Sequence, residues 1–358
     1  MIVVIGAGVA GLASGLALAQ RGREVVVLER HRRAGLDTST HNSGVIHAGL
    51  YYPPGSLKAV LCVEGRDRLT AFCVSHGVPH HTSGKLVVAT TSGEEPELEQ
   101  LERNARASGV DEVDIVDAAF VRRREPHVRA TRALWSPRTA WIDAEAYVRT
   151  LQRELERLGG HVLPGSPVIG VAPAGDHVQV TTPHEVIDAE LVVNAAGLYT
   201  DEVSALCGGE TFRIYPCRGE YAELTERASA LVNGLVYPVP HPSGHGLGVH
   251  LTKTLPGTVW LGPSIRYQAR KDDYEDHRRP LEDFLEDTLR LLPKVTIADL
   301  RMSGSGIRAK LHPPTEKFAD FMIRRDAQQP WLIHAAGIDS PGLTASLAIG
   351  ERVAALAQ

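Results

Sequence analysis

A short apolar run that leads into a glycine-rich turn constrains this fold more than any other feature of the chain. Residues 2–5 are Ile-Val-Val-Ile, and Gly6, Gly8 and Gly11 follow with the spacing GxGxxG. An apolar run without alternation is typical of a strand buried in a parallel sheet. In such a unit the first glycine permits a tight turn, the second lets the backbone approach a pyrophosphate, and the third lets a helix pack closely on the strand. The start of the chain therefore predicts a nucleotide-binding turn.

The residues after this turn complete a β-α-β unit. Residues 12–21 are rich in Ala and Leu and predict a helix that ends at Gly22, and residues 24–28 predict a second buried strand. Glu29 closes that strand at about the distance from the glycines where an acidic residue binds the ribose of a dinucleotide. A carboxylate at this position disfavours a 2′-phosphate, so NAD or FAD is favoured over NADP as the ligand. The fingerprint alone does not choose between NAD and FAD.

Composition limits the class of protein that carries this unit. The chain has 358 residues, which suggests two domains at about 150 residues each. Hydrophobic residues make up 43% and charged residues 23%, which excludes a mainly disordered chain. The net charge of −5 argues against general nucleic-acid binding. No apolar run is long enough to predict a transmembrane segment, and the start of the sequence predicts no signal peptide.

The cysteines indicate the redox compartment. The chain has four of them, at positions 62, 73, 207 and 217, and none forms a CxxC pair. We therefore expect neither a disulfide framework nor a metal site, and a reducing cytoplasm fits this usage best. Small buried side chains are the better interpretation of all four.

Parallel-strand patterns recur at places that are far apart in the sequence. Besides the start, they occur at 187–197 and at 331–334, with a helix expected over 341–357. Short strands with Pro and Gly turns are expected between them, at 213–215, 220–224, 246–251 and 258–261. Further expected elements are helices over 56–76, 94–108, 143–158 and 280–292, a strand over 85–90 and an irregular loop over 35–55. Ser56 is expected to cap the first of these helices, and Asp143 stands at the N-terminus of the third.

This order predicts an α/β fold in which a Rossmann-like nucleotide-binding domain is assembled from discontinuous segments. An inserted α+β domain with a mainly antiparallel sheet would bind the substrate. We assign residues 1–80, 143–210 and 300–358 to the first domain, and residues 81–142 and 211–299 to the second.

A second helix N-terminus near the end of the chain also bears on the cofactor. Ser340 suits an N-cap and Pro341 suits the first helical position. A helix start aimed at a bound cofactor would stabilise the anionic ring of a reduced flavin. A well-capped terminal helix without any ligand explains the same residues equally well.

Several segments resemble the L-2-hydroxyglutarate dehydrogenase/oxidase family, which belongs to the D-amino-acid-oxidase-like FAD-dependent oxidoreductases. The longest are the start of the chain, NSGVIHAGLYYPPGSLKA at 42–59 and SPGLTASLAI at 340–349. Shorter ones are RGEY at 218–221, YPVP at 237–240, GVHLT at 248–252 and GIRAKL at 306–311. Glycerol-3-phosphate dehydrogenases and oxidases share a similar central stretch, so that stretch does not define the substrate. Residues 241–245 depart from the family pattern.

The resemblance implies FAD as cofactor and hydride transfer from a CH–OH or CH–NH carbon to flavin N5, with the protein supplying orientation, a base and charge. The main expectation is oxidation of a small 2-hydroxy acid, L-2-hydroxyglutarate, to 2-oxoglutarate. A 2-amino acid or glycerol-3-phosphate is the alternative substrate, and a non-catalytic flavin-binding module is the alternative class.

The residues expected to contact the cofactor are Gly6, Gly8, Gly11, Glu29, Arg30, Asn42, Ser43, Gly44, Val168, Ala196, Gly197, Gly337, Ser340, Gly342, Leu343 and Thr344. Val168 is expected to begin a strand.

His47 is the candidate base, because an imidazole can accept the hydroxyl proton as hydride leaves the carbon. The alternatives are that His47 forms a hydrogen bond to the flavin or to a backbone carbonyl, or that it carries a covalent flavin link.

Arg308 is the candidate carboxylate clamp, because its planar fork matches a carboxylate in two hydrogen bonds. Residues 303–306, Ser-Gly-Ser-Gly, predict a flexible approach to it.

Four further residues are assigned to the substrate pocket. His250 is a second catalytic candidate, although a satisfied core histidine explains its strand-like context as well. Tyr237 is expected to line the pocket, Lys310 to bind a second carboxylate, and Tyr51 to contact substrate or to serve in packing. The electron acceptor, whether oxygen, a quinone or an electron-transfer protein, stays open. Peripheral contact with the inner membrane is the alternative to a purely cytoplasmic location, but no basic amphipathic helix favours it.

Overall fold

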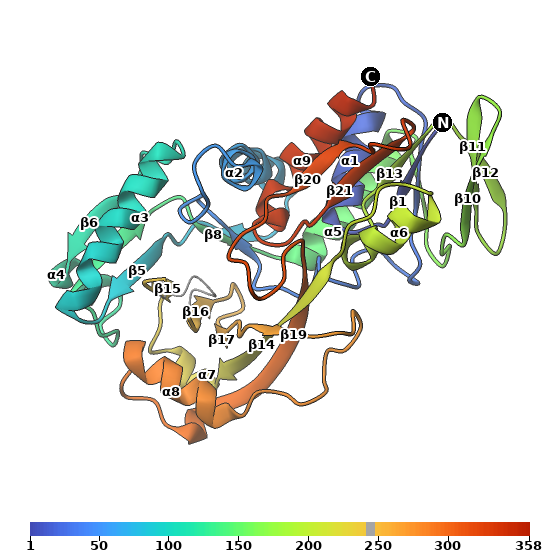
Figure 1. The fold of residues 1–358 in the computed structure, drawn as a ribbon. Helices are drawn as coiled ribbons and strands as arrows, with labels where there is room; N and C mark the ends of the chain where they lie inside the picture. Colours follow the sequence, from blue (N-terminus) through green and yellow to red (C-terminus); the bar gives the residue numbers. More distant parts are fainter. Residues whose placement is uncertain (241–247) are drawn as a thin grey trace.

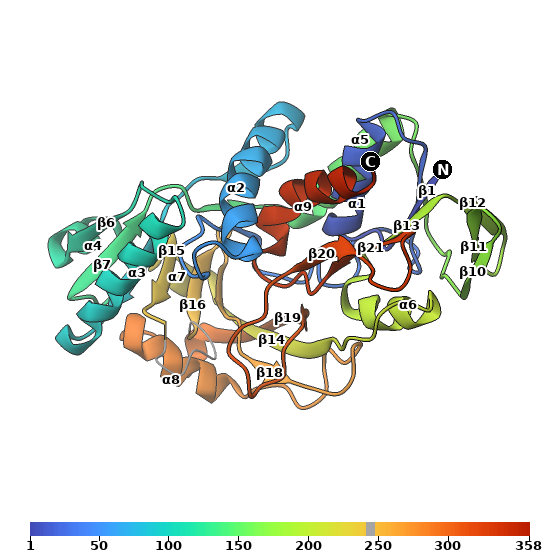
Figure 2. The ribbon, with the colours of Figure 1, turned by 45° about the horizontal axis from the view of Figure 1, so that its top comes forward.

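Two large sheets organise the computed structural model, which describes residues 1–240 and 248–358. Figures 1 and 2 show them in different halves of the molecule, with both chain termini beside the six-stranded sheet. The strand order of that sheet is β20-β21-β13-β1-β2-β9. Its strands are β1 (Ile2–Ile5), β2 (Val25–Leu28), β9 (His161–Leu163), β13 (Leu191–Asn194), β20 (Met322–Arg325) and β21 (Leu332–Ala336).

The parallel pairing confirms the nucleotide-binding sheet that the sequence predicts. β1 lies between β13 and β2 and is parallel to both, β9 is parallel to β2, and β21 is parallel to β13. Only β20, at the edge, is antiparallel to its neighbour. The strands come from the start, the middle and the end of the chain, so this sheet is assembled from discontinuous segments.

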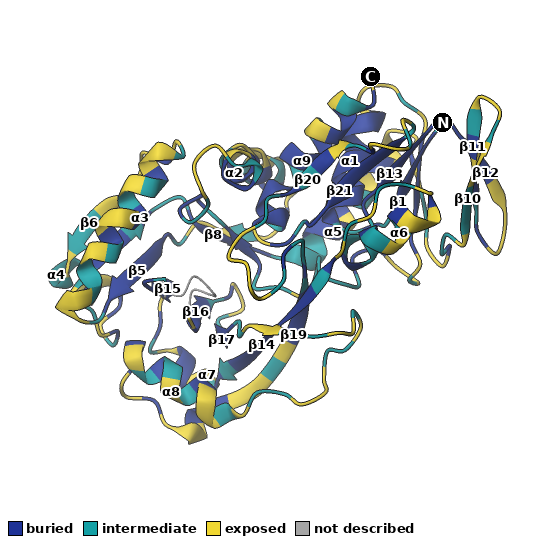
Figure 3. Cartoon of the chain, viewed as in Figure 1, coloured by how far each residue is buried: buried dark blue, intermediate teal, exposed yellow. Residues whose placement is uncertain are grey.

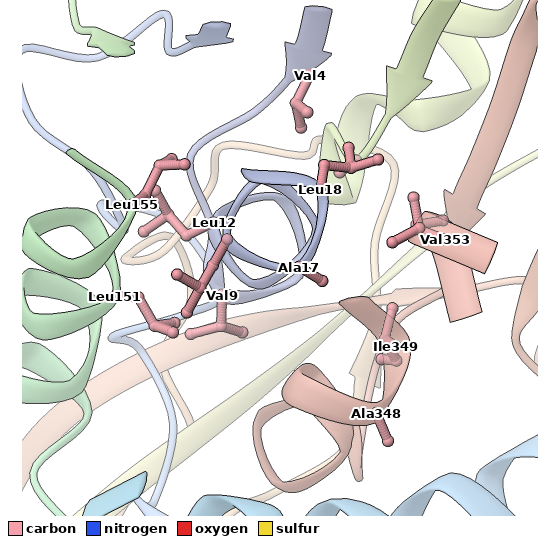
Figure 4. Close-up of a cluster of buried hydrophobic side chains, with 14 of the residues drawn as sticks. Val4, Val9, Leu12, Ala17, Leu18, Leu151, Leu155, Ala348, Ile349 and Val353 are labelled. Carbon is pink, nitrogen blue, oxygen red and sulfur yellow. The ribbon is translucent and has the colours of Figure 1, made fainter. Parts of the chain in front are cut away.

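The helices of this half pack tightly around α1 (Val9–Ala19), whose residues are all buried. Figure 4 shows side chains of α1 against those of α5 (Ala144–Arg157) and α9 (Gly342–Leu356), and Figure 3 shows the depth of this burial. Glycines allow the close contacts. A Cβ on Gly350 would lie 2.4 Å from the carbonyl oxygen of Ala13, and one on Gly65 would lie 2.4 Å from that of Thr344.

Gly11 makes the tightest of these contacts and gives the first testable prediction. A Cβ at this position would lie 1.9 Å from the carbonyl oxygen of Gly6, which is backbone and has no room to retreat. We expect Gly11→Ala to lower the free energy of unfolding by about 1–3 kcal/mol, as overpacking does. Thermal unfolding would measure it. The control is Gly93→Ala, because Gly93 is exposed and its nearest neighbouring atom lies 3.9 Å from such a Cβ. Equal melting temperatures for the two variants would contradict the prediction.

The second large sheet has nine strands and is mainly antiparallel, as expected. Its order is β18-β14-β17-β16-β15-β5-β7-β6, with β19 also paired to β14. Only β5 and β15 pair in parallel. The strands are β5 (Lys85–Ala89), β6 (Asp114–Asp117), β7 (Arg132–Ser136), β14 (Tyr215–Leu224), β15 (Leu235–Pro238), β16 (His250–Lys253), β17 (Val259–Gly262), β18 (Arg266–Tyr267) and β19 (Leu300–Lys310).

Strand β19 bears on two expectations. The sequence division placed residues 300–310 in the nucleotide-binding part, and they form an eleven-residue strand antiparallel to β14. Residues 303–306 belong to this strand and are not a flexible approach to Arg308: Ser305 and Gly306 pair with β14, and the register shifts at residues 303 and 304. Gly and Ser have low strand propensity, and only the partner strand compensates for it. We propose that the substrate-binding part extends to residue 310.

Other strands have bounds that differ from those expected from the sequence. The strand expected at 213–215 overlaps β14 only at Tyr215, and β14 continues to Leu224 and includes the strand expected at 220–224. The strand expected at 246–251 begins at His250, and residues 241–247, including the stretch that departs from the family pattern, lie outside the described residues. Two smaller sheets join β10 (Gly170–Ala174) to β11 (His177–Thr181) and β12 (Val186–Ala189), and β8 (Ala140–Ile142) to β3 (Val45–Ile46) and β4 (His80–His81).

The expected helices are present, and the N-caps at Ser56 and Asp143 are confirmed. The side chains of these two residues accept hydrogen bonds from the third residue of α2 (Leu57–His76) and of α5, as N-caps do. At α9, however, Ser340 is not the cap. The helix begins at Gly342, and Pro341 is the N-cap without a side-chain bond. The remaining helices are α3 (Glu95–Ala107), α4 (Ala118–Arg124), α6 (Thr200–Leu206), α7 (Glu226–Ser229) and α8 (Leu281–Leu291), with 3-10 turns at Ser92–Glu94, Gly197–Tyr199 and Ile297–Asp299.

None of the helices within residues 1–240 and 248–358 combines the length and the apolar character that a membrane span requires.

Candidate active site

Two cavities meet at the N-terminus of α1, where the two halves of the molecule face each other. The first cavity lies at the carboxyl ends of β1 and β2, which is where parallel sheets bind ligands. The second cavity lies between that point and the nine-stranded sheet. The two cavities adjoin, because both are lined by Gly8, Thr38, Ser39, Ala195 and Gly197.

Glu29 is held at the edge of the first cavity by backbone groups. One carboxylate oxygen accepts a hydrogen bond of 2.9 Å from the N–H of Ala7, and the other accepts one of 2.9 Å from the N–H of His31. Arg30 lies 3.8 Å over the ring of Tyr199 and 2.9 Å from a carboxylate oxygen of Asp37. These contacts form one wall of the cavity from a carboxylate, a guanidinium and an aromatic ring.

The N-terminus of α1 offers an anion site between the two cavities. No acidic side chain lies in its first turn, so the positive end of the helix is not neutralised there. The N–H of Val9 donates to the Oγ of Ser39 at 2.9 Å, and a Cβ on Gly8 would lie 2.9 Å from that same oxygen. The absence of a Cβ at Gly8 thus allows the hydroxyl of Ser39 to lie close to the start of the helix, and contact of Gly8 with a pyrophosphate stays a prediction.

In the second cavity, His47 is held by two helices. Its backbone N–H donates to the Oγ1 of Thr344 on α9 at 2.9 Å, and its carbonyl lies 3.6 Å from the Sγ of Cys62 on α2. The Nε2 atom lies 3.5 Å from the Oγ of Ser340. The Nδ1 atom is buried and has no hydrogen-bond partner among the described residues.

Strands of the nine-stranded sheet place three more candidates opposite His47. The imidazole of His250 stacks on the ring of Tyr237, with centroids 3.5 Å apart. Arg308 on β19 lines the same cavity, and its guanidinium reaches the carbonyl oxygen of Ser264 only at 3.4 and 3.5 Å. In the part of the chain that the structure describes, Arg308 forms no ion pair with a carboxylate. Its charge is therefore available to an anionic ligand.

Lys310 also lines the second cavity, but it is paired. Its ammonium lies 3.2 Å from one oxygen of Asp339, and that of Lys58 lies 2.6 Å from the other. Although burial opposes it, these two charges lower the pKa of Asp339. Two ammonium groups against one carboxylate leave a net positive charge at this end of the cavity.

Both imidazoles are neutral at ordinary pH. Burial, assisted by the charge of Lys85, lowers the pKa of His47 to about 3. Burial and the charges of Lys85, His47 and Arg308 lower the pKa of His250 well below its usual value. A neutral imidazole can accept a proton, so the cavity combines a base with a cation that binds carboxylates.

Comparison with known proteins identifies the family. The family model for FAD-dependent oxidoreductases of the DAO type matches residues 1–356. The chain belongs to this family. It is 34% identical to the mitochondrial L-2-hydroxyglutarate dehydrogenase of Arabidopsis thaliana, over 98% of this chain and 82% of that one. It is 30% identical to the mitochondrial L-2-hydroxyglutarate dehydrogenase of Caenorhabditis elegans, over 98% of this chain and 92% of that one.

A solved structure supports the fold of this flavoenzyme. The L-α-glycerophosphate oxidase of Mycoplasma pneumoniae, solved with FAD bound, superposes with a TM-score of 0.90 at 24% identity, over 99% of this chain and 94% of that one. The chain is thus an FAD-dependent oxidoreductase that acts on a CH–OH donor, as the sequence motifs predict.

The two adjoining cavities fit FAD. The first cavity is lined by Glu29 and Arg30, Gly8 lines both cavities, and the second cavity reaches the N-terminus of α9. We propose that the predicted cofactor residues on these walls hold FAD: Gly6, Gly8, Glu29, Arg30, Asn42, Ser43, Val168, Ala196, Gly197, Ser340, Gly342 and Leu343. The roles of these residues stay predictions. Val168 lines the first cavity, but it precedes β10 and does not begin a strand.

The other predicted residues lie outside both cavity walls. Thr344 holds the loop of His47, as described above, and Gly11 packs α1 onto β1. Gly44 accommodates the positive φ of 62° at the turn before β3, and Gly337 does the same, at 67°, after β21. Tyr51 packs behind the second cavity, so its assignment to substrate contact has no support from the cavity walls.

Two charged residues of this region were not among the site residues predicted from the sequence. Lys85 is completely buried beside the second cavity, and Asp339 pairs with the lysine that was chosen for a carboxylate. A feature of the sequence could have identified each of them: Lys85 begins an apolar strand, and Asp339 directly precedes the Ser-Pro-Gly motif. A charge inside an apolar strand is uncommon unless it is paired or functional.

Gly219 on β14 gives a prediction about the position of Arg308. A Cβ on this glycine would lie 2.8 and 2.9 Å from the two terminal nitrogens of the guanidinium. We expect Gly219→Ala to fold, because a side-chain end can move, but to displace the guanidinium and to lower kcat/KM by about 10- to 100-fold. Steady-state kinetics with flavin content as reference would measure this. Gly304→Ala, on the paired strand with no atom within 4 Å, is the control, and an equal effect there would contradict the prediction.

Proposed function

We propose that this flavoenzyme oxidises L-2-hydroxyglutarate to 2-oxoglutarate. The observation that carries the proposal is the guanidinium of Arg308, which forms no ion pair within residues 1–240 and 248–358, in the same cavity as the neutral imidazole of His47. A carboxylate clamp beside a base suits a 2-hydroxy acid, in which the carboxylate and the reacting hydroxyl are on neighbouring carbons. The names of the relatives compared above, which match over nearly the whole chain, support this substrate.

The residues of the cavity divide the chemistry between them. FAD, when bound, accepts the hydride from C2 of the substrate. His47 accepts the proton of the 2-hydroxyl, and we assign this to Nε2, because Nδ1 is buried and Nε2 lies near Ser340 on the cavity wall. Arg308 binds the carboxylate next to that hydroxyl and thereby orients the C2 hydrogen. The stacked pair of His250 and Tyr237 forms the adjoining wall and excludes water from it.

We propose that Lys310 receives the second carboxylate of the substrate. The pair of Lys58 and Lys310 around Asp339 has a net positive charge, and Lys310 is the member on the cavity wall. A distal carboxylate would share Lys310 with Asp339. This arrangement favours a dicarboxylate over a monocarboxylate of the same length.

Anaerobic reduction of the flavin tests the proposal. The purified FAD-loaded protein is mixed without oxygen with L-2-hydroxyglutarate, and the visible flavin absorbance is followed. We expect fast bleaching with this substrate, slower bleaching with L-2-hydroxybutanoate, and none with D-2-hydroxyglutarate. Reduction by glycerol-3-phosphate or by a 2-amino acid, but by no hydroxy acid, would reject the substrate. Failure with all of them would favour a non-catalytic flavin-binding module.

The electron acceptor is a separate question from the substrate. Oxygen, a quinone and an electron-transfer protein each can reoxidise a reduced flavin. We propose a cytoplasmic location, with peripheral membrane contact as the alternative if a quinone is the acceptor. Mixing the reduced enzyme with oxygen or with a soluble quinone analogue would distinguish the acceptors by their reoxidation rates.

A further inference from the structure

A buried imidazole lies beside the lysine to which we assign the second carboxylate of the substrate. The Nζ atom of Lys310 lies 3.4 Å from the Nε2 atom of His312 and 3.2 Å from a carboxylate oxygen of Asp339. His312 follows just after the end of β19, and only 4% of its surface is exposed. It is on neither cavity wall, so it acts on a ligand only through its neighbours.

The contacts of His312 determine which of its ring nitrogens carries a proton. Nδ1 lies 3.0 Å from the carbonyl oxygen of Pro313, which can only accept, so Nδ1 carries a hydrogen. The ammonium of Lys310 can only donate, so the lone pair of the ring lies on Nε2. Both contacts require the same neutral tautomer. The hydroxyl of Tyr267 on β18, 3.3 Å from Nδ1, packs beside the same edge of the ring.

The two acceptors around Lys310 leave part of its ammonium for a ligand. An ammonium has three N–H donors, of which one faces Asp339 and another faces His312. The third is available to a ligand in the second cavity, because Lys310 lines its wall. A neutral imidazole accepts a hydrogen bond without adding negative charge, whereas a second carboxylate here would cancel the net positive charge of Lys58, Lys310 and Asp339.

Strand geometry relates this ammonium to the carboxylate clamp. Arg308 and Lys310 are two residues apart on β19, so their side chains project from the same face, and both line the second cavity. Two residues of an extended strand span about 7 Å. A diacid with one carboxylate on Arg308 would therefore extend along the strand toward Lys310, and the position of the ammonium would decide how well the second carboxylate is bound.

We propose that His312 is a positioning residue that makes the enzyme selective for dicarboxylates, because it holds the ammonium of Lys310 at the cavity wall with one donor free. Without the imidazole, Asp339 alone holds the flexible stem of Lys310, and the ammonium is less well placed for a distal carboxylate. The proposal rests on the proposed function, since it concerns the second carboxylate of that substrate.

The selectivity of flavin reduction tests this role. It is measured on the FAD-loaded protein as the ratio of kcat/KM for L-2-hydroxyglutarate to that for L-2-hydroxypentanoate, which has the same carbon chain but lacks the second carboxylate. We expect His312→Phe, which keeps a ring but removes the acceptor, to lower this ratio about tenfold through a higher KM for the diacid. The kcat/KM for L-2-hydroxypentanoate should stay nearly constant, whereas a merely structural role would lower both values equally.

Two further variants make the comparison specific. His312→Gln places an amide oxygen near the position of Nε2, where it can accept from Lys310, so it should recover much of the ratio. His161→Phe makes the same change as the test variant at an exposed residue of β9 and should leave the ratio unchanged. A wild-type ratio in His312→Phe would overturn the proposal. Equal kcat/KM values for the two acids in the wild type would also overturn it, although oxidation of 2-hydroxy acids would stand.

The tautomer of His312 provides a measurement that needs no turnover. In FAD-loaded wild-type protein labelled with 15N at histidine, the signals of His312 are those absent from His312→Gln. We expect a protonated Nδ1 and an unprotonated Nε2 near neutral pH. If His312→Phe does not fold, this tautomer supports the proposal, and a proton on Nε2 overturns it because that nitrogen could not accept from Lys310. A flavin that no 2-hydroxy acid reduces would refute the proposed function and leave this measurement intact.

Discussion

Arg308→Met is expected to lower kcat/KM for L-2-hydroxyglutarate by about 100- to 1000-fold, with FAD content unchanged. Removing one partner of a desolvated charge pair costs about 2–5 kcal/mol, and each 1.4 kcal/mol is a factor of ten. The guanidinium forms no ion pair within the described structure, so it is free to bind the substrate carboxylate. KM should rise and kcat should fall, because the clamp binds the substrate and also orients its C2 hydrogen. Rapid-mixing reduction of the flavin gives the two constants separately.

The same strand supplies a matched control for this variant. Arg301 also lies on β19 but is exposed and far from the cavity wall. Arg301→Met should therefore keep at least half of the wild-type kcat/KM. Arg308→Lys separates charge from shape: an ammonium keeps the charge but not the two parallel hydrogen bonds, so partial recovery is expected. Normal kinetics in Arg308→Met would refute the carboxylate clamp.

His47→Gln is expected to slow flavin reduction by about 100- to 10,000-fold, which is the usual contribution of a positioned acid or base. The amide can hydrogen-bond but cannot accept the hydroxyl proton at any working pH. Substrate affinity should change little, because the carboxylate is held by Arg308. The exposed His81 provides the control substitution, His81→Gln, which should leave the rate unchanged.

The alternatives for His47 give different results. If it only hydrogen-bonds the flavin, His47→Gln should reduce the rate by less than about tenfold and shift the visible spectrum. If it carries a covalent flavin link, acid-precipitated wild-type protein should stay yellow and the His47→Gln precipitate should be colourless. A colourless wild-type precipitate excludes the covalent link.

The pH dependence of the wild-type enzyme follows from the environment of His47. Its pKa is lowered to about 3 by burial and by the charge of Lys85, so the base form persists as the pH falls from 7 to 5. An imidazole with the ordinary pKa of about 6.5 would lose most of its base form over that range. We therefore expect kcat/KM to fall less than twofold between pH 7 and pH 5. A fall of tenfold or more that follows an ordinary histidine titration would contradict this expectation.

Local patterns in the sequence predicted the nucleotide-binding half well. The strand at 2–5, the glycines of the fingerprint and Glu29 are close together in the chain, and their spacing alone specifies a strand, a turn and a helix start. The capping residues Ser56 and Asp143 were found for the same reason, since a cap acts within one turn of its helix. The motifs around His47 and Ser340 carry the resemblance to the flavoenzyme family.

Interactions between distant segments were not predictable in this way. Residues 303–306 look flexible in isolation, and only the pairing of β19 with β14 makes them a strand. Ser340 was expected to cap α9, but its hydroxyl instead lies 3.1 Å from that of Tyr52 and near His47. Such outcomes depend on which segments meet in three dimensions.

The sequence by itself therefore indicated the fold class through short motifs whose physical roles are local, and it indicated the cofactor and the reaction type through the family resemblance of its segments. Only the tertiary structure decided the charge balance of the candidate site. It showed that Lys310 is shared with Asp339, that Arg308 is unpaired among the described residues, and that Lys85 is buried behind Tyr237. The physical reason is that the free energy of a charge depends on its burial and its neighbours, and both are set by packing between elements that are remote in the chain.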